Sequence, residues 1–403
     1  MRGQLTITIL VILLLIPTLT VQAESGVQVT QPEINYTFGE HLLLETQIQA
    51  ETPISQVKLY LKPEGETNTI TASAPMTTPD RVIHEVNLIE NPIRAFSIIS
   101  YYYEVYLENG STFTSPTFTF FYDDNHFEWQ MRESGAFRVH WYQGDVEFAQ
   151  TVLDIAYEGL LKIQSYIPVP QPDQVDIYVY ASAMDMQSTI LLSGQSWVAG
   201  HADPDLSVIV VSLPPGPAQV YETKRQIPHE LMHVMLYQRL GPAYTNLPKW
   251  LNEGLASITE LFPNPDYHML LENAYEMETL ISIDELCQTF PVDASSIQLS
   301  YAESTSFTRF LHQQYGNQGI EGLLSQYANG LGCERGVEVA LDKPLSKLEQ
   351  DWRRVTFNEH SFSAALETLS PWFLLCTLVL FTPTVLIIRG LRKKGTRGAT
   401  SND

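Results

Sequence analysis

The chain has 403 residues, 44% of them hydrophobic, which is enough for two or three globular units with substantial cores. Its 46 acidic residues outnumber its 23 Lys and Arg residues. The resulting net charge of −23 disfavours general attraction to nucleic acids or anionic lipid surfaces, so we expect no nucleic-acid partner.

The N-terminal residues have the layout of a secretory signal. Residues 2–23 combine one Arg, an apolar run over Leu10–Ile16, a helix-breaking Pro17 and a small-residue ending at Ala23. We therefore predict a signal peptide over residues 1–23, cleaved after Ala23. The alternative is an uncleaved signal anchor, which would leave the remainder on the same side of the membrane.

Short alternating segments fill residues 24–123, with turn residues about every ten positions. This pattern predicts an all-β sandwich module that resembles immunoglobulin-like or fibronectin-like domains, with Asn109-Gly110 as a hairpin turn. The aromatic run Tyr101–Tyr103 fits the core and flank of such a sandwich better than a binding patch.

The periodicity changes over residues 124–365, for which we predict an α+β domain. Strands are expected over residues 137–143, 174–182 and 205–213, with an amphipathic helix over 145–167 between the first two. After the third strand the chain is largely helical. This order places most helices late in the domain, after a mixed sheet.

The first helix after the sheet carries the strongest motif, IPHELMHVML. Residues four apart on a helix point the same way, so His229 and His233 can share one ion, with Glu230 between them. A third ligand is available in LPKWLNEGLASITELF, where Glu253 stands among apolar neighbours and would be costly to bury unpaired. We expect these residues to form one zinc site per chain.

The combination of HELMH and WLNEGLA resembles the gluzincin metallopeptidases, and within them the peptidase MA-like group. The resemblance implies a zincin-like fold over about residues 130–330. It implies that His229, His233 and Glu253 bind Zn²⁺ and that Glu230 is the general base.

Gluzincins also use a later Tyr or His as donor to the tetrahedral oxyanion. Tyr301 is our candidate for this catalytic role, with His312 behind it; the alternative is a Tyr that only packs in the core. The segment before the metal helix would act as the edge strand, so a substrate peptide would pair near Leu206–Ser212, with His201 near the cleft or in a turn without a role. Pro228 either starts the metal helix or lies within a longer one.

No segment resembles the GAMEN motif of the large aminopeptidases, so endopeptidase and exopeptidase modes both stay open. Only Cys287 and Cys333 lie outside the C-terminal apolar stretch, which allows one structural disulfide. Whether they pair is left open by the sequence.

The last apolar stretch, residues 372–388, has no charge and is followed by several Arg and Lys residues. It predicts a single transmembrane helix over 369–388 with a basic cytoplasmic tail over 389–403. The protein is then expected in the cell membrane as a single-pass protein, with its bulk outside the cytoplasm.

These features together predict a membrane-anchored zinc peptidase that hydrolyses peptide or protein substrates with a zinc-activated water and Glu230 as general base. The alternative is a cell-surface binding protein whose peptidase-like domain holds zinc only for structure. The intact Glu230 favours the enzyme, because a structural site would tolerate its loss.

Overall fold

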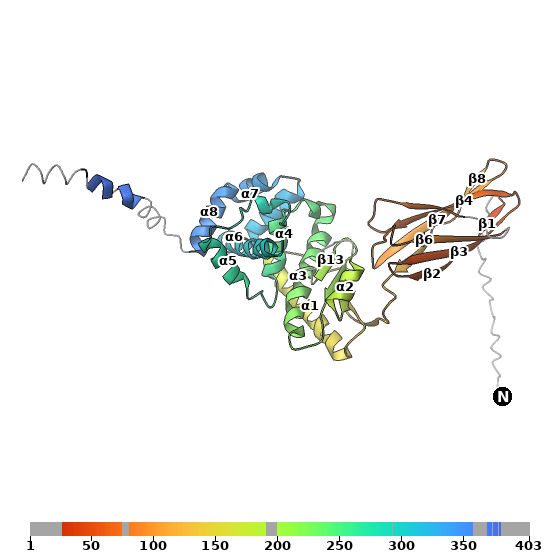
Figure 1. The fold of residues 1–403 in the computed structure, drawn as a ribbon, viewed down its shortest axis with the longest axis horizontal. Coiled ribbons are helices and arrows are strands. Elements are labelled where there is room, and N and C mark those ends of the chain that lie inside the picture. Colours follow the sequence, from red (N-terminus) through yellow and green to blue (C-terminus); the bar gives the residue numbers. More distant parts are fainter. Residues whose placement is uncertain are drawn as a thin grey trace, which may run out of the picture. The chain divides into compact units, whose positions relative to one another are not determined.

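The computed structural model describes residues 26–74, 80–190, 200–291, 293–357, 369–372, 374–377 and 379. The chain divides into two compact units, Met1–Phe127 and Glu128–Asp403 (Figure 1). An all-β region is followed by an α+β domain, as the sequence predicted. The predicted domain limits at residues 123 and 365 stay predictions, and the predicted signal peptide lies outside the described residues.

The first unit contains two antiparallel sheets. One is built around β3 and consists of β1 (Val27–Val29), β2 (Glu33–Thr37), β3 (His41–Ala50) and β6 (Arg81–Asn87). The other is built around β4 and β7 and consists of β4 (Ile54–Pro63), β5 (Ile70–Ala74), β7 (Ser97–Leu107), β8 (Thr112–Thr114) and β9 (Phe118–Tyr122).

Strict alternation along these strands produces the core of the first unit. Leu42 and Leu44 of β3 are fully buried, as are Tyr101 and Tyr103 of β7, whereas Tyr102 between them is only half-buried. Two of the three tyrosines are therefore core residues.

The sheet of the second unit has the order β10, β11, β12, β14, β13. Its central strands β11 (Phe137–Trp141), β12 (Val175–Tyr180) and β14 (Val208–Ser212) are parallel, and β10 (Gln130–Ser134) and β13 (Gly200–Asp203) pair antiparallel at the two edges. The expectation that a substrate would pair near Leu206–Ser212 is wrong, because β14 has neighbours on both sides. The edge beside the helical region is β13.

Helices cover this sheet and continue to residue 356 (Figure 1). They are α1 (Val146–Tyr166), α2 (Ala183–Thr189), α3 (Gln219–Leu240), η2 (Gly241–Asn246), α4 (Lys249–Ile258), α5 (Tyr267–Glu276), η3 (Glu285–Cys287), α6 (Ala294–Ala328), α7 (Cys333–Leu341) and α8 (Leu345–Thr356). α1 begins at Asp145, whose side chain accepts a hydrogen bond from the backbone N–H of Phe148 at 2.9 Å. Its apolar face packs on α3.

The contact between α1 and α3 depends on Gly159. A Cβ at this position would lie 3.0 Å from Cβ of Pro228, so only glycine leaves the proline ring room. Pro228 lies inside α3, nine residues after Gln219, and therefore belongs to a longer helix rather than starting one.

Cys287 and Cys333 form a disulfide with their Cα atoms 6.0 Å apart. It joins η3 to the first residue of α7. The indole N–H of Trp250, on α4, donates a hydrogen bond to Sγ of Cys333 at 3.3 Å. The disulfide therefore also contacts the helix that carries Glu253.

Two predictions for the C-terminal region are corrected. Among the residues that the structure describes, no helix is both long and apolar enough to cross a membrane, which overturns the predicted transmembrane helix over 369–388 and the single-pass membrane location derived from it. Most of the predicted span and the predicted tail lie outside the described residues.

A buried carboxyl group in α6 makes the stability of the second unit depend on pH. Glu303 is fully buried, and its Oε1 accepts a hydrogen bond from the N–H of Ile281 at 2.9 Å. Burial raises the pKa of Glu303 to about 8; nearby Glu349 and Glu285 act in the same direction, and Arg353 opposes them.

We expect Glu303→Gln to stabilise the second unit at pH 8 by about 3–5 kcal/mol and to change little at pH 4.5. Below the pKa of the unfolded state, Glu303 is neutral in both states and costs the fold little. As the pH rises from there toward the folded pKa of about 8, the unfolded state releases its proton first, so the free energy of unfolding falls. Urea unfolding followed by tryptophan fluorescence measures this, because all six Trp residues lie after residue 128. Glu338→Gln on the exposed surface of α7 is the control; equal destabilisation by Glu303→Gln at both pH values would contradict the prediction.

Candidate metal centre

Helix α3 presents two imidazoles on one face. His229 and His233 are one turn apart, and their ring centroids lie 5.2 Å from each other. The side chains of Leu231, Met232 and Val234 around them are fully buried, so the helix is fixed by packing over most of its surface. The two rings are held in place by the core rather than by a flexible loop.

Helix α4 brings Glu253 to the same place. It follows the η2 turn and packs against both α3 and α6 (Figure 1). A Cβ at position 254 would lie 2.1 Å from Oγ1 of Thr308 and 2.5 Å from the backbone oxygen of Ser304. The glycine after Glu253 therefore allows the close approach of α4 and α6.

Three possible ligand atoms converge from these helices. Oε2 of Glu253 lies 3.4 Å from Nε2 of His229 and 3.7 Å from Nε2 of His233. The ligand atoms of the three residues all lie within 4.8 Å of one another, and they are the one such group found among the described residues. The three residues that the sequence pattern pointed to as ligands are thus brought together.

Each imidazole faces an acceptor on its other nitrogen. Nδ1 of His229 lies 3.1 Å from Oε1 of Glu260, and Nδ1 of His233 lies 3.1 Å from Oδ1 of Asn252. Asn252 in turn donates from Nδ2 to the hydroxyl of Tyr244 at 2.9 Å. Carboxylate and amide oxygens only accept, so each Nδ1 keeps its proton, and Nε2 is the ring nitrogen that faces Glu253.

The sequence did not identify these supporting residues. Asn252 could have been found because it directly precedes Glu253 in the motif. Glu260 lies two residues beyond the end of α4, so no helical spacing marks it. Tyr244 lies in η2, where no periodic pattern marks it.

Glu253 is buried but well balanced by positive and polar neighbours. Its side chain is 4% exposed, and its Oε1 lies 2.7 Å from Nζ of Lys249, another residue that the sequence did not single out. Burial alone would raise its pKa, but His233, Lys249 and His229 hold the pKa of Glu253 well below the usual range. The carboxylate is therefore ionised at neutral pH.

The two histidines titrate in opposite directions. Burial works against the charged form of His229, but the carboxylates of Glu253 and Glu260 outweigh it and raise its pKa to about 10. Burial lowers the pKa of His233 to about 4, with His229 acting in the same direction and Glu253 against it. The pair therefore carries about one positive charge beside the ionised Glu253.

Glu230 lies at the sheet edge of the site. Its side chain is 8% exposed, and burial raises its pKa against the pull of His229 and His201. A Cβ at Gly200 on β13 would lie 2.7 Å from Oε1 of Glu230, so this carboxyl group contacts the edge strand. His201, the next residue on β13, lies close enough to act on Glu230 electrostatically.

Tyr301 approaches from α6, with its ring centroid 6.3 Å from that of His229. The charge of Glu253, burial and the charge of Glu230 raise its pKa well above the usual value, which keeps the hydroxyl protonated as a donor. His312 packs against Tyr166 instead, with ring centroids 4.7 Å apart, and bonds Asn317.

The arrangement suits binding of one cation by two imidazole nitrogens and a carboxylate oxygen. A second carboxyl group, Glu230, stands beside it, and a protonated phenol, Tyr301, faces it from another helix. Such a set can combine a Lewis acid, a general base and a hydrogen-bond donor.

Comparisons with known proteins place this region in a family. A family model described as the Peptidase MA superfamily matches residues 155–358. None of the curated proteins compared with the chain matches it.

The three solved structures named here each resemble about a quarter of the chain. "Br derivative BhCBM56" is 13% identical with a TM-score of 0.18, covering 22% of this chain and 88% of that chain. A carbohydrate-binding module family 56 β-1,3-glucan binding domain is 15% identical, with a TM-score of 0.17 and coverages of 23% and 98%. Catalytically inactive OgpA from Akkermansia muciniphila, in complex with an O-glycopeptide, is 13% identical with a TM-score of 0.21; 25% of this chain matches 29% of that chain.

We expect Gly254→Ala to destabilise the second unit by about 1–3 kcal/mol, because the added methyl group meets the backbone of α6 and forces α4 away from it. Gly322→Ala on α6 is the matched control: its Cβ would meet Ala340 at an ordinary 3.5 Å, so higher helix propensity should stabilise the protein by up to about 1 kcal/mol. Urea unfolding of both variants measures this. Equal stability of Gly254→Ala and wild type would contradict the packing described for α4 and α6.

Proposed function

Because the chain belongs to the Peptidase MA superfamily, we propose that it is a zinc-dependent peptidase of the gluzincin type. The observation that carries this proposal is the convergence of Nε2 of His229, Nε2 of His233 and a carboxylate oxygen of Glu253 within 4.8 Å. Glu230 lies on the same helix as the two histidines, where a general base is needed.

The donor set fits Zn²⁺. Imidazole nitrogen and carboxylate oxygen are ligands that zinc uses in catalytic sites, which keep a fourth position open. Oε2 of Glu253 is buried and accepts no hydrogen bond from the described residues, so its lone pairs are available to a bound cation. Bound Zn²⁺ would supply Lewis acidity, polarising the scissile carbonyl and lowering the pKa of water.

The residues of the chain have separate roles in the proposed reaction. Glu230 takes a proton from the attacking water and passes it to the leaving amine. Tyr301 donates a hydrogen bond to the oxyanion of the tetrahedral intermediate. Glu260 and Asn252 hold the two imidazole rings in the orientation and tautomer that direct Nε2 toward the metal.

A peptide or protein substrate would bind along β13. This strand has a neighbour only on its β14 side among the described residues, so its other edge offers backbone groups to an extended peptide. The contact between Gly200 and Glu230 supports this placement, because it brings the base next to the peptide's path.

We expect Glu230→Gln to retain one zinc ion per chain and to lose at least about 100-fold in peptide hydrolysis, because the amide cannot accept the water proton. Peptide-library cleavage and metal analysis of the purified protein measure both quantities. Glu222→Gln, which removes a carboxylate from the first turn of α3, is the control and should cleave as wild type does. Zinc in wild type without cleavage of any library would instead support a non-catalytic binding protein with a structural metal.

We expect Tyr301→Phe to lower kcat by about 100-fold or more with little change in KM, because the lost donor acts on the oxyanion rather than on the bound substrate. Steady-state kinetics with one cleaved peptide measure this. Tyr327→Phe removes the hydroxyl of another buried Tyr on α6, one that bonds the backbone oxygen of Cys333 at 2.9 Å, and should leave kcat unchanged. An unaltered kcat in Tyr301→Phe would show that Tyr301 is a packing residue.

A further inference from the structure

Lys249 places a cation beside the carboxylate that would bind the metal. It is the first residue of α4, one turn before Glu253, and its Nζ lies 2.7 Å from Oε1 of Glu253. The side chain of Lys249 is 40% exposed, so the pair joins a partly exposed cation to a buried anion. The reaction proposed above gives Lys249 no role.

The position of Lys249 is unfavourable for α4 itself. The N-terminus of a helix carries a partial positive charge, so acidic residues stabilise the first turn and basic residues do not. α4 has no acidic residue in its first turn. A Lys that precedes a Glu by four residues is also the weaker order of such a pair. The stability of α4 therefore does not account for Lys249, whereas the carboxylate of Glu253 does.

The two oxygens of Glu253 have different surroundings. Oε1 faces Nζ of Lys249, whereas Oε2 lies 3.4 Å from Nε2 of His229 and 3.7 Å from Nε2 of His233. Hydrogen bonds between ionised groups are short and strong. The contact with Lys249 therefore holds Oε1 away from the imidazoles and leaves Oε2 as the oxygen that faces them.

Phe290 limits where the ammonium group of Lys249 can go. Nζ of Lys249 lies over the ring of Phe290, 5.9 Å from its centroid, which is a cation–π distance. The other contact of this ring is with Tyr301, at 5.3 Å between centroids. Lys249 is thus held between a carboxylate and an aromatic ring that also packs against the proposed oxyanion donor.

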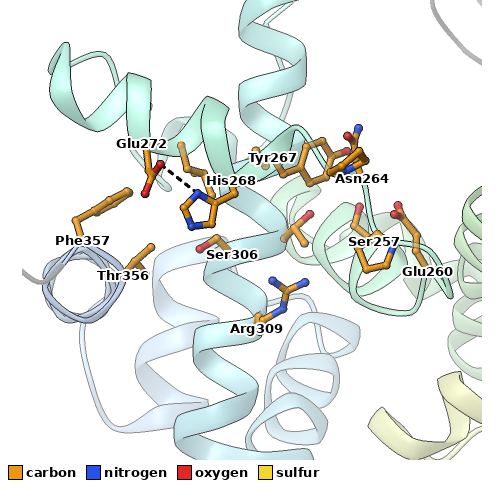
Figure 2. Close-up of a pocket in the computed structure, with 15 residues that line it drawn as sticks. Ser257, Glu260, Asn264, Tyr267, His268, Glu272, Ser306, Arg309, Thr356 and Phe357 are labelled. Carbon is orange, nitrogen blue, oxygen red and sulfur yellow. Dashed lines mark ion pairs between the residues drawn. The ribbon is translucent and has the colours of Figure 1, made fainter.

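The second acid of the site has no such partner. Glu260, which faces Nδ1 of His229, borders a cavity of about 280 Å³ (Figure 2). Lys162 donates to the backbone oxygen of Glu260, and no Lys or Arg in the described part of the chain forms an ion pair with its carboxylate. An ammonium group therefore accompanies the acid that would bind the metal, Glu253, and not the acid behind the histidine.

We propose that Lys249 is a positioning residue of the metal centre, which engages Oε1 of Glu253 so that this carboxylate offers the ion a single oxygen, Oε2. This role rests on the proposed zinc peptidase. A catalytic zinc site needs an open position beside its three protein ligands, and a carboxylate that binds through both oxygens would occupy it. Lys249 thereby preserves the place of the water from which Glu230 takes a proton.

Lys249→Met in the full-length protein tests this role, because it removes the ammonium group and keeps most of the apolar stem. We expect the variant to bind zinc about tenfold more tightly than wild type, since a cation next to the metal is lost and Oε1 becomes free to bind. A residue that only supported the structure of the site would have the opposite effect. Competition with a chelator measures the affinity.

Cobalt(II) in place of zinc reports the coordination directly. Its visible absorption depends on the number and geometry of the ligands, and it is weaker for five ligands than for four. We expect a weaker cobalt band in Lys249→Met than in wild type. In peptide cleavage, kcat should fall by about tenfold or more with little change in KM, because the open position is lost.

Two further variants separate charge from position. Lys249→Arg keeps a cation beside Glu253 and should restore the zinc affinity and the cobalt spectrum toward wild type. Lys347→Met removes an exposed Lys from the first turn of α8 and should match wild type in all measurements.

Zinc binding by Lys249→Met that is no tighter than in wild type, or an unchanged cobalt spectrum, would overturn the proposal. A raised KM with unaltered zinc affinity would instead make Lys249 a group that binds substrate. Wild type that binds zinc and cleaves no peptide would contradict the proposed function alone, since both metal measurements remain. Wild type that binds no zinc would overturn both.

Discussion

The buried carboxylate of Glu253 is the constraint on which the second unit depends. It has almost no solvent exposure, so its charge must be balanced by protein groups. Two imidazoles from α3 and the ammonium group of Lys249 provide this balance. Placing the two imidazoles beside one carboxylate oxygen requires α3 and α4 to meet at a fixed angle and separation, which the rest of the helical region must then maintain.

Close helix contacts maintain that geometry, and glycine is used where side chains would prevent them. Gly159 lets α1 support α3 behind the histidines, and Gly254 lets α6 support α4 behind the glutamate. Tyr301 is carried by the same α6, so the packing that positions Glu253 also brings the phenol toward it. Gly200 completes the set on the sheet side, where a larger residue would displace Glu230.

The sequence predicted the features that depend on helix period and missed those that depend on tertiary contact. The spacing of His229 and His233 determines their common face, and an acid among apolar residues marks Glu253, so these positions could be read directly. Glu260 was missed because it lies beyond the end of α4, where the path of the chain depends on the turn. The edge strand β13 has only four residues without apolar alternation, and it exists because β14 offers a partner. The C-terminal span was predicted from hydropathy alone, and no helix among the described residues is long and apolar enough to support it.

The disulfide adds a further support to α4. Closing a loop with a sequence separation of 46 between Cys287 and Cys333 contributes about 4 kcal/mol through the unfolded state, a large fraction of the stability of an ordinary domain. Its effect is local as well, because Trp250 donates to Cys333 and stands three residues before Glu253 on the same helix. The helix that bears a buried charge is therefore linked by one hydrogen bond to the disulfide, which joins η3 to α7. A polar site that is costly to bury is held by contacts whose stability does not depend on that site.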